Sequence, residues 1–352
     1  MIDKLISSLP KSVDGVLIVS EINRRYFTSV PSSDGILLAT KNGSVFLTDS
    51  RYIEEAQNIV KCCEVAELRK VSEQLPELCK DFGVKVLMAE GERLTVNQLK
   101  AYRKILKGIT VTTVGTDDLI DSLRLIKTED ELQSVIRAQR IAEKAFDHIL
   151  GFIKEGVTER EIALELDFFM LRNGAEAISF ETIAVSGANS SKPHGVPTDK
   201  KVAKGDFITM DYGAVVNGYH SDMTRTVAVG EVSDKQVEVY NTVLEAQLRA
   251  LAVLREGVKC SEADLAAREY ITEKGYGEYF RHSTGHGVGI EIHEKPALSP
   301  KNDKKLQRGN IVTIEPGIYI PGEFGVRIED LALITEKSCE NLTKITKKLV
   351  KL

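Results

Sequence analysis

The sequence has no long hydrophobic run. None of its stretches approaches the ~18 consecutive apolar residues that a membrane-spanning helix requires. The start, MIDKLISSLPKS, lacks the uninterrupted apolar core of a secretory signal peptide. We therefore expect a protein that neither crosses a membrane nor carries an export signal.

Positive charge is also in short supply. The formal net charge is −5, and there is no run of lysine or arginine with interleaved aromatic residues. These features give no support to nucleic-acid binding. The DxDxDG loop of an EF-hand and the GxxxxGK[ST] phosphate-binding loop are absent as well, which excludes those two kinds of site.

The cysteines follow no paired spacing. There are five of them, an odd number, and no two are spaced as CxxC. They are Cys62, Cys63, Cys79, Cys260 and Cys339. Scattered cysteines in an odd number fit a reducing compartment, so we expect a cytoplasmic protein.

The composition is that of an ordinary globular protein, with 42% hydrophobic and 28% charged residues. A chain of 352 residues suffices for two domains that each bury a core. In residues 1–120, β-like runs such as GVLIVS and KVLMAE alternate with helical ones such as RYIEEAQNIV, and Asn42-Gly43 marks a tight hairpin. We predict a mixed α/β domain over residues 1–120 and a second domain over residues 121–352.

The second domain contains a weak internal repeat. A capping box over 128–131 opens a helix that reaches about residue 153, and a second helix ends at Asn173-Gly174. Farther along, a helix over 235–255 precedes another that ends at Lys274-Gly275. The β-like segments that follow each helix pair are 178–187, 206–229 and 311–335. We predict an α+β fold in which two αα-ββ halves form one curved antiparallel sheet with helices on its outer side.

The segment MDYGAVVNGYHSDMTRT has the pattern of a β-hairpin with Asn217-Gly218 at its tip. This register pairs residue 211 with 224 and residue 222 with 213. Asp211 and Asp222 then project from the same face, roughly 7–8 Å apart at the backbone. A solvated polar face is the usual explanation of such a pair, but two like charges without a partner in the hairpin also suit a shared cation.

A second pair of carboxylates lies in NIVTIEPGIYIPGEFGVRIEDLALIT. Two β-like arms flank the turn-forming PGEFG, and Glu315 and Glu329 lie about equally far from its centre near Gly322. They can therefore approach each other across the strands. Their apolar neighbours indicate burial, and a buried glutamate is almost always paired or coordinating.

Three of the six histidines lie in the glycine-rich stretch HSTGHGVGIEIHE, namely His282, His286 and His293. A lone histidine is more often a structural residue than a ligand, whereas three so close together leave a structural role and a functional cluster as equal alternatives. His194 in SSKPHGVPTD is a fourth candidate, on a turn.

Four carboxylates and at least one imidazole, drawn from two similar halves, suit a pair of divalent cations. Oxygen-rich ligation with a single nitrogen favours manganese or cobalt, with zinc or iron as alternatives. Two such ions ~3.5–4 Å apart lower the pKa of a shared water and polarise the bond under attack. The sequence therefore predicts hydrolysis as the reaction class.

These segments together resemble the pita-bread metallopeptidases, and in particular the Xaa-Pro peptidases aminopeptidase P and prolidase. The matching motifs are MDYGAVVNGYHSDMTRT, HSTGHGVGIEIHE, TIEPGIYIPGEFGVRIED and SGANSSKPHGVPTD. INRRYFTS and FLTDSRYIEEA resemble the creatinase-type N-terminal domain of the same enzymes. The resemblance thus implies a creatinase-type domain over residues 1–120 and a pita-bread catalytic domain over residues 121–352.

The resemblance also implies a role for each candidate residue. The ligands of two divalent ions, with manganese preferred, would be Asp211, Asp222, His286, Glu315 and Glu329. Glu315 would in addition accept the proton of the attacking water. The substrate pocket would be lined by His194, His282, His293, Tyr319 and Arg327. We assign His194 and His293 to catalysis, where they hydrogen-bond the developing oxyanion and deliver a proton to the leaving nitrogen.

The activity implied is that of a dinuclear exopeptidase that hydrolyses the bond between an N-terminal residue and a following proline, an Xaa-Pro aminopeptidase. A prolidase restricted to dipeptides is the alternative, since both enzymes use the same ligands and pocket histidines. A non-catalytic pita-bread module that binds peptides or proteins is an alternative of another class, but it would not need five intact ligands. The resemblance implies a homodimer as well.

Overall fold

The structure, a computed structural model, describes residues 1–352. The chain divides into two compact units, residues 1–124 and 125–352. The division falls within α6 (Thr116–Leu125), close to the boundary that we placed near residue 120. No helix combines the length and the hydrophobicity that a membrane span would require.

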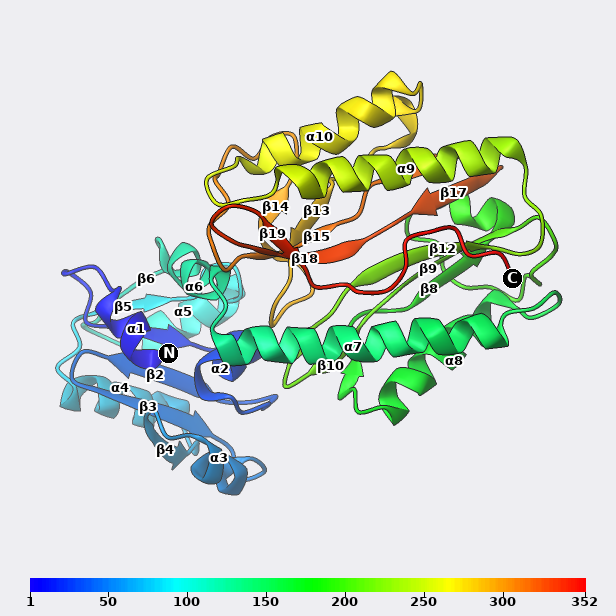
Figure 1. The fold of residues 1–352 in the computed structure, drawn as a ribbon. Helices are drawn as coiled ribbons and strands as arrows, with labels where there is room; N and C mark the ends of the chain where they lie inside the picture. The colour runs from blue at the N-terminus through cyan, green and yellow to red at the C-terminus, as the bar shows by residue number, and fades with distance from the viewer. The chain divides into compact units, whose positions relative to one another are not determined.

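The N-terminal unit is built on a six-stranded mixed sheet with the order β4-β3-β2-β1-β5-β6 (Figure 1). Its strands are β1 (Gly15–Ile18), β2 (Ile36–Thr40), β3 (Gly43–Thr48), β4 (Glu64–Glu67), β5 (Val86–Ala89) and β6 (Thr110–Thr112). Its helices are α1 (Ile2–Ser7), α2 (Glu21–Thr28), α3 (Ile53–Ile59), α4 (Val71–Asp81), α5 (Val96–Ile105) and α6. β1, β2 and β3 pair antiparallel, whereas β1–β5, β5–β6 and β3–β4 are parallel, which is the mixed α/β organisation predicted from the sequence.

The hairpin expected at Asn42-Gly43 is present, but its turn lies one residue earlier. Thr40 pairs with Gly43, so the two loop residues are Lys41 and Asn42, and Gly43 opens β3. A Cβ atom on Gly43 would lie 2.5 Å from the ring of Phe82. Close packing, rather than turn geometry, therefore explains this glycine.

The C-terminal unit repeats one arrangement twice. Its helices are α7 (Glu129–Phe152), α8 (Glu159–Arg172), α9 (Asp234–Val253) and α10 (Cys260–Glu273). The strands of the first half are β7 (Ala177–Ile178), β8 (Ile183–Ser186), β9 (Phe207–Tyr212), β10 (Ala214–Val216), β11 (Tyr219–His220) and β12 (Met223–Ala228). Those of the second half are β13 (Gly285–Gly287), β14 (Glu294–Leu298), β15 (Ile311–Ile314), β16 (Gly317–Ile320), β17 (Phe324–Arg327), β18 (Asp330–Ile334) and β19 (Cys339–Asn341). Two short 3₁₀ turns, η1 (Gly187–Ser191) and η2 (Gly277–Tyr279), complete the unit.

The predicted helix limits agree with these elements. Thr128 caps α7 with Glu131 in a capping box, and Asn173 and Lys274 cap the C-terminal ends of α8 and α10. In Figure 1, α9 and α10 lie on one side of the strands and α7 and α8 on the other. The curved sheet consists of short ladders, with the orders β12-β9-β8, β14-β13-β15-β18-β19, β16-β17 and β11-β10-β7.

Each half buries its own apolar core. Ala142, Phe146 and Leu166 of α7 and α8 pack with strands of the first half. Val243 and Ala263 of α9 and α10 pack with β15 to β18 of the second half. The strands between the two cores are therefore held from both sides, and polar side chains on them have a fixed place.

A buried ion pair joins the halves behind the strands. Arg225 of β12 is 1% exposed and its Nη2 lies 2.8 Å from Oδ1 of Asp330, whose side chain has no exposed surface. Arg225 also donates to the backbone oxygen of Glu329 at 2.5 Å. Gln247 and Lys347 donate to the other oxygen of Asp330, so the carboxylate is fully satisfied. Removing one partner of such a pair leaves an uncompensated buried charge.

Replacing Arg225 with methionine should therefore lower the free energy of unfolding of the C-terminal unit by about 3 kcal/mol, because Lys347 would be the one cation left to offset the buried charge of Asp330. Urea unfolding measures this loss. The control is Lys235→Met, which breaks an exposed pair with Glu323 and should change stability little. A loss in the Arg225 variant no larger than in the control would contradict the role given to the buried pair.

Candidate active site

The first pair of carboxylates comes from β9 and its continuation toward β12. Asp211 pairs with Thr224 in the ladder, as the sequence predicts. At the tip of the hairpin Asn217 and Gly218 have φ angles of +51° and +80°, the conformation that a type I′ turn requires. This turn fixes the register and so brings Asp211 and Asp222 to one side of the strands.

The hairpin is not one continuous ladder, however. The pairing predicted between residues 222 and 213 is missing, because Gly213 approaches the backbone of Ser221 so closely that a Cβ atom would lie 1.9 Å from its oxygen. The tip pairs with β7 in a separate sheet, and Asp222 precedes β12. Asp222 is thus released from the ladder and is only 4% exposed.

The second pair of carboxylates follows the predicted register. Gly317 pairs with Arg327 in β16 and β17, and Ile314 pairs with Asp330 in β15 and β18. Glu315 and Glu329 lie opposite each other between these two ladders. Thr224 Oγ1 donates to Oε2 of Glu329 at 2.7 Å, which ties this pair to the first half.

His286 of β13 is oriented by its own backbone. Its Nδ1 lies 3.0 Å from the carbonyl oxygen of Gly287, an acceptor that places the ring proton on Nδ1. Nε2 is then left with a lone pair, 3.5 Å from Asp222 Oδ2 and 3.6 Å from Glu315 Oε1. A histidine with this tautomer is ready to bind a cation through Nε2.

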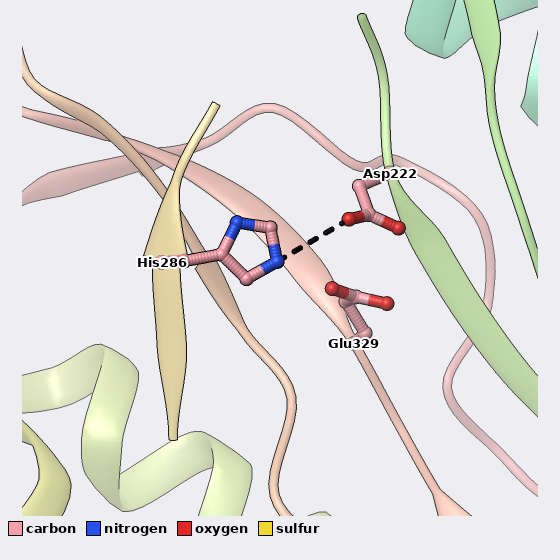
Figure 2. A group of neighbouring side chains, drawn as sticks. All are labelled: Asp222, His286 and Glu329. Carbon is pink, nitrogen blue, oxygen red and sulfur yellow. Dashed lines mark ion pairs between the residues drawn. The ribbon is translucent and has the colours of Figure 1, made fainter. Parts of the chain in front are cut away.

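Figure 2 shows that Asp222, His286 and Glu329 point toward one another from three separate segments. One ligand atom of each lies within 4.8 Å of the others. Asp222 and Glu329 are 4% and 1% exposed, so water cannot screen their charges effectively.

The electrostatics of the cluster call for positive charge. Burial raises the pKa of Asp222 and of Glu329 well above the ordinary range, and the surrounding carboxylates raise both further. Burial also raises the pKa of Glu315 to about 8 and lowers that of His286 to about 4. Four carboxyl groups in one buried space repel one another unless cations are bound between them.

Arg327 is committed to neighbouring groups. Its Nη2 donates to Asp211 Oδ2 at 2.5 Å and its Nη1 donates to the hydroxyl of Tyr319 at 2.7 Å. That hydroxyl lies 3.0 Å from Nε2 of His282. Burial, with the charge of Arg327, lowers the pKa of His282 to about 4, and burial raises that of Tyr319 to about 12. At neutral pH both side chains are therefore uncharged hydrogen-bonding groups.

A cavity of about 520 Å³ adjoins the cluster. It is lined by every residue that the sequence analysis singled out: His194, Asp211, Asp222, His282, His286, His293, Glu315, Tyr319, Arg327 and Glu329. His194 and His293 stand in loops at its exposed part, and the ring of His293 lies 4.3 Å from that of His286. The structure thus brings all of these residues together, while the role of each stays a prediction.

Sequence reasoning missed the apolar side of the cavity. The additional apolar lining residues include Ile183 at the start of β8 and, in loops, Phe180, Val196, Pro197 and Ile292. Single apolar residues in loops carry no periodic signal that separates a pocket wall from ordinary core. Of these residues, Val196 and Pro197 alone could have been suspected, because they lie close to His194 in the sequence.

The residues present fit divalent cations on two observations. Asp211 Oδ1 is buried and has no hydrogen-bond partner, although carboxylate oxygens buried in proteins are normally paired. The donor set, four carboxylates and one imidazole nitrogen, is also typical of hard or borderline divalent metals.

Comparison with known protein families agrees with this fit. The model described as metallopeptidase family M24 matches residues 133–336, which is more than half of the chain. The chain belongs to metallopeptidase family M24. The model described as the creatinase/prolidase N-terminal domain matches residues 3–126. This M24 chain is therefore an enzyme, and its family implies divalent metal ions.

Solved structures and curated relatives match the M24 chain over nearly its whole length. A structure titled Xaa-Pro dipeptidase from Bacillus anthracis has a TM-score of 0.96 and 44% identity, covering 100% of this chain and 99% of that one. An X-Pro aminopeptidase structure from Thermotoga maritima has a TM-score of 0.94 and 37% identity, with 100% and 99% covered. A curated Xaa-Pro dipeptidase of Pyrococcus furiosus is 38% identical, with 99% of both chains covered. The predicted pita-bread fold with a creatinase-type N-terminal domain is confirmed.

The cluster predicts cation-dependent stability. Manganese added to metal-stripped protein at ~100 times its Kd should raise the free energy of unfolding by about 2.7 kcal/mol, because an ion that binds only the folded chain stabilises it by mass action. Asp222→Asn should lose most of this gain and retain less metal after dialysis, whereas Glu181→Gln, outside the cluster, should keep both. Thermal unfolding and metal analysis measure the effect. An equal response of the two variants would refute the site.

Proposed function

We propose that this chain is a metal-dependent exopeptidase that hydrolyses the bond between an N-terminal residue and a following proline, acting on dipeptides as an Xaa-Pro dipeptidase. The single observation that carries the proposal is the cavity in which four clustered carboxylates, those of Asp211, Asp222, Glu315 and Glu329, lie beside four histidines. The names of the Bacillus anthracis and Pyrococcus furiosus relatives support the substrate class and favour a dipeptidase over our first expectation, an aminopeptidase.

Five residues would hold two divalent ions at this site: Asp211, Asp222, His286, Glu315 and Glu329. We propose manganese, since oxygen-rich ligation with one nitrogen suits it, ahead of cobalt, zinc or iron. When bound, such ions lower the pKa of a water molecule and polarise the carbonyl group under attack.

The chain's own residues would then handle the protons. Glu315 lies 3.6 Å from His286 Nε2 at the edge of the cluster, where it accepts the proton of the attacking water. His194 and His293 are at the exposed part of the cavity, where they hydrogen-bond the developing oxyanion and return a proton to the leaving nitrogen.

The cavity also suits proline. The nitrogen of proline in a peptide has no hydrogen to donate, so recognition of this residue rests on the shape of its ring. The apolar wall formed by Phe180, Ile183 and Ile292 can pack against such a ring. Tyr319 and His282 supply uncharged hydrogen-bonding groups beside it.

One observation favours an Xaa-Pro aminopeptidase as a second candidate. A free dipeptide places a carboxylate directly after the proline, whereas a longer peptide has an uncharged amide there. Among the residues that line the cavity, Arg327 is the one with a permanent positive charge. It is already paired with Asp211 at 2.5 Å. A cavity in which this cation is engaged offers less to a carboxylate than to an amide.

A length series decides between the two. Metal-stripped protein reloaded with manganese should cleave Ala-Pro with a kcat/KM at least about tenfold, or ~1.4 kcal/mol, above that for Ala-Pro-Ala and longer peptides. Ala-Ala, which lacks proline, and the stripped protein are the controls and should show little release of alanine. Equal or better cleavage of the longer peptides would establish the aminopeptidase instead, and no cleavage of any peptide would exclude both.

We also infer a homodimer, on the precedent of the Xaa-Pro peptidases that the sequence resembles. The expected mass in solution is twice the chain mass of 38.9 kDa. Light scattering coupled to gel filtration measures it. A fully active species with the mass of one chain would contradict this inference.

A further inference from the structure

Glu159, the first residue of α8, has a completely buried side chain. Its Oε1 accepts from the backbone N–H of Ser186 at 2.7 Å and from the Ser186 hydroxyl at 3.0 Å. Its Oε2 accepts from the backbone N–H of Thr198 at 3.0 Å and from the Thr198 hydroxyl at 2.7 Å. The amide of Asn189 donates to both oxygens, at 3.1 and 3.2 Å.

These partners are the two ends of one loop. Ser186 is the last residue of β8, and Thr198 lies twelve residues farther along the chain. One carboxylate therefore closes the segment between them, which we call the 186–198 loop. Because each oxygen serves a different end, a change at Glu159 removes hydrogen bonds from both ends together. Ser186 keeps its pairing with Ile208, and the carbonyl oxygen of Thr198 still accepts from the backbone N–H of Arg160 at 3.0 Å.

The 186–198 loop forms one wall of the cavity. Pro193, His194, Gly195, Val196 and Pro197 all line it, yet His194 and Val196 are exposed to solvent. Exposed side chains at the tip of a loop have few packing contacts to hold them in place. The position of His194 therefore depends on how the loop is held elsewhere.

The middle of the loop is in contact with the second half, but these contacts do not join the two ends of the loop. Arg327 donates to the carbonyl oxygen of Pro193 at 3.1 Å, and Ser190 Oγ accepts from the backbone N–H of Gly325 at 2.9 Å. Glu159 is the residue that binds both ends.

Helix capping does not account for Glu159. Thr158 and Glu161 already form a complete capping box at this end of α8. The helix dipole favours a carboxylate at this position, but it does not require one that is buried and bonded to a loop. A buried carboxylate with five donor atoms is costly to assemble and fixes those donors in one arrangement.

We propose that Glu159 is a positioning residue, which holds the 186–198 loop closed and thereby sets the place of His194 over the cavity. The consequence for catalysis rests on the proposed function, in which His194 contacts the reacting group. The holding of the loop itself does not depend on that function and can be tested separately.

The first test uses metal-free protein. Glu159→Gln places an amide N–H against donors of one end of the loop, so backbone amides of residues 187–197 should exchange hydrogen at least about tenfold faster. The matched control is Thr158→Ala, which removes the cap of α8 but has no contact with the loop and should leave these amides unchanged. Exchange that is equally fast in both variants, or unchanged in Glu159→Gln, would overturn the proposal.

The second test uses the manganese-loaded enzyme and Ala-Pro. Glu159→Gln should lower kcat by about 10- to 100-fold with metal content unchanged, since a small displacement of a catalytic group has an effect of this size. The double variant with His194→Ala should be no slower than His194→Ala alone, because both changes act through one side chain. Additive losses would show that Glu159 acts on stability in general and would refute the positioning role.

One outcome separates this proposal from the proposed function. If no variant or parent cleaves Xaa-Pro peptides but the exchange result holds, the function is wrong and the positioning role stands. If Glu159→Gln does not fold, Thr198→Val removes one donor at the exposed end of the loop and should speed exchange in residues 187–197 by several-fold. Unchanged exchange in that variant would overturn the proposal.

Discussion

Repulsion among four buried carboxyl groups is the constraint on which the C-terminal unit depends. Asp222 and Glu329 are almost without solvent, and Arg327, the cation beside them, is engaged with Asp211. A folded chain can keep such a cluster of carboxyl groups only with bound cations or bound protons, because both lower the net negative charge of the cluster. The same repulsion that would weaken a purely structural protein favours the binding of the divalent metal ions that the M24 family implies.

The two halves share the cost of this arrangement. Each half contributes two carboxylates from strands whose apolar faces pack on that half's own helices. Three of the four carboxylates lie where ladders are interrupted, Asp222 before β12 and Glu315 and Glu329 between paired strands, whereas Asp211 lies within β9. Interrupted ladders free the side chains to converge, while the ladders on either side fix the backbone.

Further buried charges hold the site from behind. Arg225 joins Asp330 to the backbone of Glu329, and Glu159 closes the loop that carries His194. In the second half Asp264 accepts from the backbone N–H of Thr284 at 3.0 Å, next to the segment that carries His282 and His286. Groups buried in this way have one satisfactory arrangement of hydrogen bonds, and so they impose that arrangement on the neighbouring segments of the candidate site.

The sequence by itself determined the local structure and the identity of the polar cluster. Capping at Thr128, the type I′ turn at Asn217-Gly218 and the symmetry of Glu315 and Glu329 about Gly322 depend on neighbours in the chain, which a periodic pattern records. The motifs, which resemble those of the pita-bread metallopeptidases, also indicated the family.

Only the tertiary structure decided where the hairpin breaks, which residues form the apolar wall and what Glu159 contacts. Gly213 departs from the ladder because of its approach to Ser221, and Glu159 bonds residues up to 39 positions away in the chain. Such contacts arise when distant segments pack, and no spacing in the sequence encodes them. This difference between local and tertiary features has a physical cause. The hydrogen bonds of turns and helix caps form within a few residues of the chain, whereas the partners of a buried charge come from distant segments that the fold places beside it.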